Sequence, residues 1–92
     1  MREYQIMYWQ DVPAQVRVFD GRKPISKVMP ERFQKKIDRI AMAKDLAGTD
    51  AYLEHWQWTE RRQWEGDDDI TQILESLVRE LVQEHDRQAD AS

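Results

Sequence analysis

The residue types best suited to binding gather in one short stretch, YLEHWQWTERRQW at residues 52–64. It holds three of the chain's four tryptophans within nine residues, and two adjacent arginines lie between the second and the third. Tryptophan and arginine are enriched among the residues that contribute most to protein–protein binding. They also suit single-stranded nucleic acid, because aromatic rings stack on bases and guanidinium groups contact phosphates. The stretch is therefore either a contact surface or a strand that buries its aromatic side chains.

Residues suited to catalysis or metal binding are sparse. The chain has no cysteine, and its two histidines, His55 and His85, belong to different segments. The acidic run Asp67–Asp69 is typical of a helix start, where carboxylates cap backbone N–H groups and complement the helix dipole. The sequence holds no glycine-rich phosphate loop and no serine in a nucleophile motif. We therefore expect no metal, no cofactor and no catalytic residue, with a dispersed carboxylate site as the remaining enzymatic alternative.

The net negative charge of the chain favours a protein partner over nucleic acid. The formal net charge is −4, and an acidic surface repels a phosphate backbone over a screening length of about 10 Å. The charge is uneven, because Arg22–Lys44 is basic and Glu65–Ser92 is acidic. We expect a protein partner or self-association, and we keep single-stranded nucleic-acid binding by stacked tryptophan and arginine as the alternative.

Length and hydropathy predict one small domain outside the membrane. The chain has 92 residues, which is the size of a single domain. It has no run of about 20 apolar residues that could span a bilayer, and its first residues lack the apolar core of a signal peptide. The absence of cysteine is compatible with the cytoplasm, which is the simplest compartment. We expect a cytoplasmic domain at residues 1–86 and a frayed polar tail at 87–92.

Alternating apolar residues near the N-terminus predict a β-hairpin. Glu3–Trp9 and Gln15–Asp20 are rich in strand-forming residues at every second position. The turn residues Asp11–Ala14 separate them, so the two strands are antiparallel. Arg22–Met29 is ambiguous and can add only a short extension, because Pro24 disfavours a central strand.

Two amphipathic helices are expected further along the chain. Met29-Pro30-Glu31 signals a helix start and Gly48 signals its end. The inward stripe of this helix consists of Phe33, Ile37, Ile40 and Ala41. The last helix follows Asp67–Asp69, and its apolar residues recur at helical spacing on one continuous face. That face consists of Ile70, Ile73, Leu74, Leu77, Val78, Leu81 and Val82.

The run Leu53–Trp64 lies between the two helices and favours a strand. Because Trp56 and Trp58 are two residues apart, they share one face of it. This face is either the core beneath the helices or the bare side of the sheet, since a one-residue shift in register exchanges the two. The order β-β-α-β-α predicts a two-layer α+β sandwich, in which both helices cover one face of a three-stranded, mostly antiparallel sheet.

The uncovered sheet face is the predicted contact surface. A domain with only two layers leaves that face to solvent or to another molecule. Its predicted contact residues are Trp9, Arg17, Trp56, Trp58, Arg61, Arg62 and Trp64.

Three segments resemble the bacterial virulence factor domain family, which is named after conserved virulence factor C. These are YWQDVPAQV at residues 8–16, PERF at 30–33, and GTDAYL at 48–53 followed by Trp56. The resemblance covers nearly the whole chain, and no catalytic motif defines the family. Larger members join this domain to an iron–sulfur-scaffold-like domain and helical repeats, which implies an adaptor or regulatory module. Stand-alone members imply an accessory role beside folate- and corrinoid-dependent methyl transfer.

Overall fold

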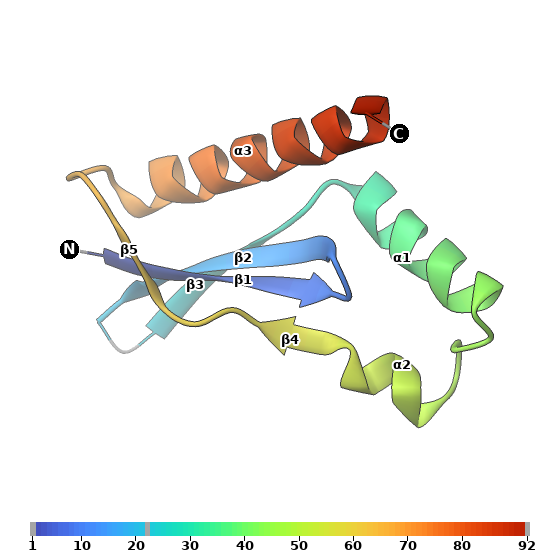
Figure 1. Cartoon of the computed structure of the whole chain (residues 1–92). Helices are drawn as coiled ribbons and strands as arrows, with labels where there is room; N and C mark the ends of the chain where they lie inside the picture. Colours follow the sequence, from blue (N-terminus) through green and yellow to red (C-terminus); the bar gives the residue numbers. More distant parts are fainter. Residues whose placement is uncertain (1, 22, 92) are drawn as a thin grey trace.

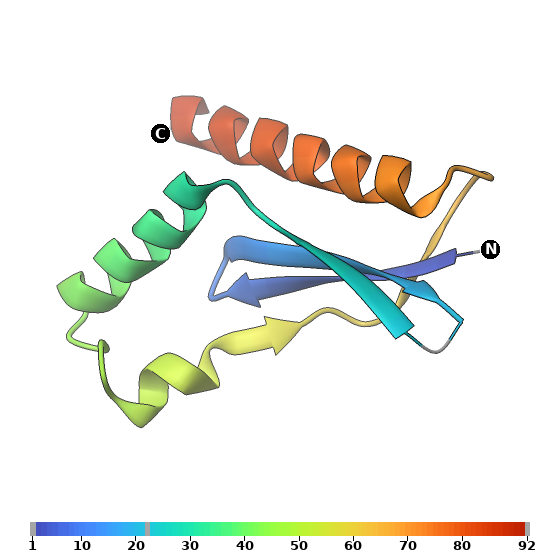
Figure 2. The same ribbon diagram turned by 180° about the vertical axis from the view of Figure 1, so that it is seen from behind.

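The N-terminal part of the chain forms an antiparallel meander of three strands, β1 (Arg2–Trp9), β2 (Val12–Asp20) and β3 (Lys23–Val28). The computed structural model describes residues 2–21 and 23–91, with side chains described as far as residue 88. The alternation predicted for the first two strands is confirmed, because Ile6 pairs with Val16 and both are buried. β3 forms although it contains Pro24, because it lies at a free edge of the sheet (Figure 2).

Two short strands complete the sheet on the other edge of β1. β4 (Trp56–Trp58) pairs with the C-terminal half of β1, and β5 (Arg62–Trp64) pairs with its N-terminal half. β1 is therefore central, with β2 and β3 on one side of it (Figure 1). The sheet has five strands rather than the predicted three, because β3 is a full strand and the run Leu53–Trp64 forms a short helix and two strands.

At the break between β4 and β5, the alternation of side chains between the two faces of the sheet is reversed. Thr59 holds the break in place, since its N–H donates to the Ile6 carbonyl (2.9 Å) and its hydroxyl accepts from the Ile6 N–H (3.0 Å). Trp58 pairs with Met7 and Trp64 pairs with Arg2. Six positions thus separate the two tryptophans, but only five separate their partners on β1. The one extra residue turns Trp64 to the face opposite Trp58.

Three helices pack on the sheet from different sides. α3 (Ile70–Ala91) covers one face, whereas α1 (Glu31–Ala43) and α2 (Asp50–Glu54) lie at the end of the β1–β2 hairpin (Figure 1). The prediction that two helices share one face is therefore wrong. Only Met29 and Pro30 connect β3 to α1, so α1 must start at the end of the sheet where β3 leaves it. α3 is helical as far as Ala91, and Ser92 lies outside the described residues.

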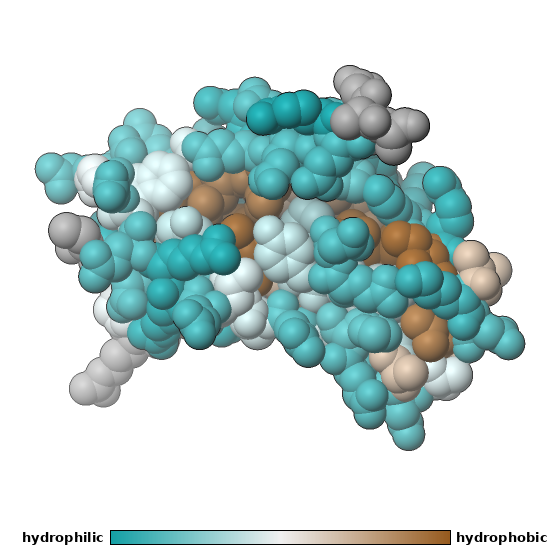
Figure 3. Space-filling view, in the orientation of Figure 1, coloured by the Kyte–Doolittle hydropathy of each residue, from teal (hydrophilic) through white to brown (hydrophobic). Residues whose placement is uncertain are grey.

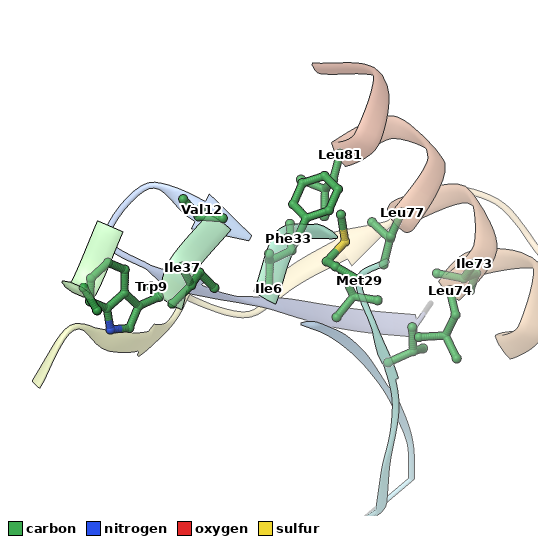
Figure 4. Packing of buried hydrophobic residues seen from close by; sticks show 13 residues of the cluster. Ile6, Trp9, Val12, Met29, Phe33, Ile37, Ile73, Leu74, Leu77 and Leu81 are labelled. Carbon is green, nitrogen blue, oxygen red and sulfur yellow. The ribbon is translucent and has the colours of Figure 1, made fainter. Parts of the chain in front are cut away.

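The core has two connected parts (Figure 4). Under α3, the residues Ile73, Leu74, Leu77 and Leu81 are buried together with those of the strands, Ile6, Val16 and Val18. At the hairpin end, Phe33, Ile37 and Ala41 of α1 are buried together with Trp9 and Val12. Both helical stripes agree with the predicted apolar faces.

The basic and acidic segments meet where α1 approaches the C-terminal half of α3. Arg32 Nη1 donates to the Asp86 carboxylate at 2.9 Å, and this hydrogen bond lowers the pKa of Asp86. One turn along α1, Lys36 Nζ lies 3.0 Å from His85 Nε2. An ammonium can only donate, so this contact is a hydrogen bond only when His85 Nε2 carries no proton. Burial, and then the Lys36 charge, lower the pKa of His85. These contacts partly neutralise the charge asymmetry inside the molecule.

Candidate protein-contact face

The sheet face that α3 does not cover, here called the outer face, has an arginine at its centre. Arg17 projects from β2, and its guanidinium carbon lies 3.8 Å from the ring centroid of Trp58 on β4. The same group lies 5.3 Å from the Phe19 ring, two residues further along β2. Arginine over tryptophan is a favourable cation–π arrangement, contributing about 0.5–1 kcal/mol at exposed sites and more when water is excluded.

Gln5 on β1 fixes the orientation of this arginine. The Arg17 Nε and Nη2 groups both donate to Gln5 Oε1, at 2.9 and 2.6 Å. Gln5 Nε2 in turn donates to the Thr59 carbonyl at 2.8 Å, which ties the pair to the break between β4 and β5. Arg17 Nη1 donates no hydrogen bond within the described part of the chain. The guanidinium is thus held in place with one edge left to receive an acceptor.

A second arginine extends this arrangement toward the N-terminal end of β1. The guanidinium carbon of Arg61 lies 3.9 Å from the Phe19 ring centroid, and Arg61 Nη1 lies 3.7 Å from the Glu3 carboxylate. Both members of the ion pair are substantially exposed, so the pair itself contributes little to stability. We call Arg17, Phe19, Trp58 and Arg61 the arginine–aromatic cluster.

An apolar groove adjoins the cluster where the outer face meets the first turns of α1. Its volume is about 630 Å³, within the range of pockets that bind small ligands or buried side chains. A β-bulge shapes its floor, because Ala14 is an extra residue on β2 and its carbonyl accepts from the Met29 N–H at 3.0 Å. The lining residues are Met7, Ala14, Gln15, Val28, Met29, Glu31, Gln34 and Trp56.

The surface view agrees with a binding face on this side of the sheet. In Figure 3 the exposed surface of α3 is hydrophilic, and the outline is hollowed along the side of the sheet away from α3. Val28 reaches the rim of the groove with 68% of its surface exposed. Exposed apolar residues beside a groove are typical of a contact surface.

Two of the predicted tryptophans occupy the outer face. Trp56 and Trp58 pair with Trp9 and Met7 of β1, and cross-strand partners share a face. Trp58 belongs to the arginine–aromatic cluster, and Trp56 lines the groove, edge-on to Tyr52 at 6.0 Å. Of the two alternatives that the sequence left open, the bare side of the sheet is the one observed, and both rings are half-buried.

The prediction that Trp9 is a contact residue is wrong, because Trp9 is fully buried. It lies on the same side of the sheet as Trp56, but helices α1 and α2 close over this end. Its indole Nε1 donates to the Tyr52 carbonyl at 2.9 Å, and its ring packs against Tyr52 and His55 at 5.6 and 5.4 Å. Trp9 therefore stabilises the core and has no surface for a partner.

Arg62 and Trp64 do not join the outer face either. Arg62 pairs with Tyr4, and Trp64 packs edge-on to Tyr4 at 6.1 Å on the side that α3 covers. The Trp64 indole donates to Asp68 Oδ2 at 3.0 Å, just before α3 begins. The residue inserted between β4 and β5 reverses the alternation, so neither residue lies on the face that carries Trp58.

The sequence interpretation missed several residues of the site. Phe19 could have been found, because it follows Arg17 by two positions in the same strand. Gln5 could not, because its place opposite Arg17 depends on the register of the hairpin. Val28 and Met29 could not, because their place depends on the path of the chain from β3 into α1.

The titratable groups with shifted pKa values lie away from the outer face. Burial, and then the Glu84 carboxylate, raise the pKa of Tyr8, which lines a smaller cavity of about 200 Å³ with His85 beside α3. Among the side chains that the structure describes, within residues 2–21 and 23–88, no three histidine or acidic groups are placed so that they could hold a metal ion. No helix in that part of the chain has the length and apolar composition of a membrane span. The outer face thus offers stacking, apolar and guanidinium contacts.

Comparison with known proteins identifies one family. The family model described as virulence factor matches residues 7–89, which include both the arginine–aromatic cluster and the groove. No curated protein and no solved structure matches the chain.

Proposed function

The chain belongs to the virulence factor family, and we propose that it acts as a non-catalytic interaction module that binds a protein partner on its outer face. The observation that carries the proposal is the apolar groove beside a fixed guanidinium–indole stack, on a sheet face that α3 leaves open. The groove accepts an apolar side chain, and Arg17 adds directional hydrogen bonding. We expect Arg17, Trp56, Trp58 and Arg61 to contact the partner.

A partner protein agrees better with this face than single-stranded nucleic acid does. Bases stack on free aromatic faces, but Arg17 already lies over the Trp58 ring and Arg61 over the Phe19 ring. The net charge of −4 further opposes a phosphate backbone.

Two broader inferences complete the proposal. The family resemblance supports an adaptor or accessory role, and folate- or corrinoid-dependent methyl transfer is the process we propose that it serves. We place this role in the cytoplasm, with which the absence of cysteine is compatible. The identity of the captured partner tests the process, and cell fractionation tests the location.

The test uses two exposed apolar residues as a matched pair. Val28 lines the groove and is 68% exposed, whereas Met42 lies on α1 outside the groove and is 73% exposed. Val28→Glu and Met42→Glu add the same charge, and both leave the core untouched. We would capture partners from native cell extract with the tagged wild-type chain and each variant, with and without nuclease, then repeat the binding with the purified partner.

The outcomes separate the alternatives. A purified protein that binds wild type and Met42→Glu equally, and loses at least tenfold in affinity for Val28→Glu, supports the proposal. Equal binding by all three chains places the contact elsewhere and rejects the outer face. Capture that disappears after nuclease treatment favours the nucleic-acid alternative.

A further inference from the structure

Side chains on the outer face form three parallel rows that cross the sheet. The first row, beside α1, consists of Met7, Gln15 and Val28. The second consists of Gln5, Arg17 and Ser26. In the third, Phe19 pairs with Pro24, and Glu3, the next residue of β1 beyond the Tyr4–Val18 pair, continues the row. Neighbouring rows are two residues apart along each strand, which corresponds to about 7 Å.

The chemical character changes from row to row. The first row forms part of the apolar groove. The second carries the Arg17 guanidinium, whose Nη1 edge is open, and the third lies beneath the Arg61 guanidinium. The apolar groove is therefore followed by two guanidinium groups, that of Arg17, which is bonded to Gln5 of the second row, and that of Arg61, which lies over Phe19 of the third. An extended peptide has the same two-residue repeat, so its alternate side chains match these rows.

We propose that the outer face binds an extended acidic segment of the protein partner, aligned with β2 as a strand of a second layer. A bulky apolar side chain occupies the groove, a carboxylate two residues away bonds Arg17, and a carboxylate four residues away meets Arg61. This inference rests on the proposed function and specifies the chemistry of the partner. Sheets that pack face to face keep their strands roughly aligned at about 10 Å, which suits such a layer.

The dimensions favour an extended segment over a helix. The groove and Arg17 lie one row apart, about 7 Å, whereas a helix with its side chains is about 10–12 Å across. A helix seated in the groove would cover the Arg17–Trp58 stack instead of reaching its open edge. Glu3 pairs with Arg61 in the free chain, and an incoming carboxylate replaces that exposed contact at little cost.

The experiment compares two peptides of identical composition. TLTETET places its glutamates two and four residues after leucine, on the leucine face of an extended chain. TLETETT moves both glutamates by one residue to the other face. The rows do not determine whether the peptide runs parallel or antiparallel to β2, so each peptide is also made with its sequence reversed. Binding is followed by amide chemical shifts of the isotope-labelled protein, for wild type, Arg61→Gln and Arg62→Gln.

We expect the in-register peptide, in one of its two orders, to shift the amides of residues 14–19 and to bind about fivefold more tightly than the shifted peptide. Arg61→Gln should remove most of that preference. Arg62→Gln should retain it, because Arg62 lies on the α3 side. Equal affinities, shifts confined to the α3 side, or no shift with any peptide would overturn the inference. If a natural partner still depends on Val28, only the acidic extended segment is rejected and the proposed function stands.

Discussion

Trp58 and Trp64 project from opposite faces of the sheet, although an even number of positions separates them. Trp58 stacks on Arg17 of the outer face, whereas Trp64 packs against Tyr4 beneath α3 and bonds Asp68. The residue inserted between β4 and β5 accounts for the difference. Trp58 is therefore accessible to a partner, whereas Trp64 helps to hold α3 on the sheet.

This placement predicts which tryptophan reports binding. The fluorescence of Trp58 should change when a partner covers the outer face, because its indole leaves water. We expect Trp58→Phe to reduce the spectral change on partner binding, with the remainder coming from Trp56 in the groove, and Trp64→Phe to preserve the full change. A change that survives in Trp58→Phe but disappears in Trp64→Phe would place the partner on the α3 side.

The burial of Trp9 predicts a large loss of stability on truncation. Trp9 is 0% exposed and its indole is hydrogen-bonded, so Trp9→Ala should lower the free energy of unfolding by about 3–5 kcal/mol. Urea denaturation followed by circular dichroism measures the loss. Trp9→Phe, which keeps an apolar ring and loses the N–H, should cost less. A loss for Trp9→Ala no larger than that for Trp58→Ala would show that Trp9 is not part of the core.

The start of α3 predicts a smaller and local effect. Asp69 Oδ1 accepts from the Gln72 N–H at 2.9 Å, while Gln72 Oε1 accepts from the Asp69 N–H at 3.2 Å, a reciprocal capping arrangement. Asp69→Ala should therefore cost about 1 kcal/mol. Asp67→Ala, an exposed neighbour in the same acidic run, should change the unfolding free energy by less than about 0.5 kcal/mol. Similar losses for the two variants in denaturation curves would argue against this cap.

The contact between α1 and α3 predicts a dependence of stability on pH. Burial and Lys36 lower the pKa of His85, Arg32 lowers it further, and the carboxylates of Asp86 and Asp11 oppose them. The unfolded chain, with a histidine pKa of about 6.5, takes up a proton before the folded chain does. Stability from this site is thus complete above the unfolded pKa, and it declines as the pH falls below that value.

His85→Gln isolates that dependence. Denaturation at several values of pH between 7.5 and 5 should show a steeper loss of stability in wild type than in His85→Gln, because both share every other titrating group. Parallel curves for the two proteins would show that the folded state does not disfavour the charged imidazole.

The sequence predicted the elements that have simple periodicity. The alternation of Ile6, Val16 and Val18 and the helical stripe from Ile73 to Leu81 are both found in the core. These patterns are local, so a single sequence contains them. The family also followed from short segments of sequence and was confirmed by the match over residues 7–89.

The sheet face on which a single side chain lies depends on parts of the chain that are distant in sequence or on the exact strand register. Trp9 was expected at the surface because its strand alternates, but helices distant in sequence cover it. Trp64 was expected beside Trp58 because their spacing is even, but one inserted residue reverses the alternation. Arg17 was found, whereas its partner Gln5 required the register of the hairpin, which depends on the turn.

The central position of β1 also determines the order in which the sheet can form. β2 and β3 follow β1 directly, so the meander closes through contacts between near neighbours, which form quickly. The other edge of β1 is paired only by residues 56–64. During synthesis that edge stays open until about thirty more residues have left the ribosome after β3. Until then it can add a strand from another chain, so this edge is a risk of aggregation in the nascent protein that pairing with β4 and β5 removes.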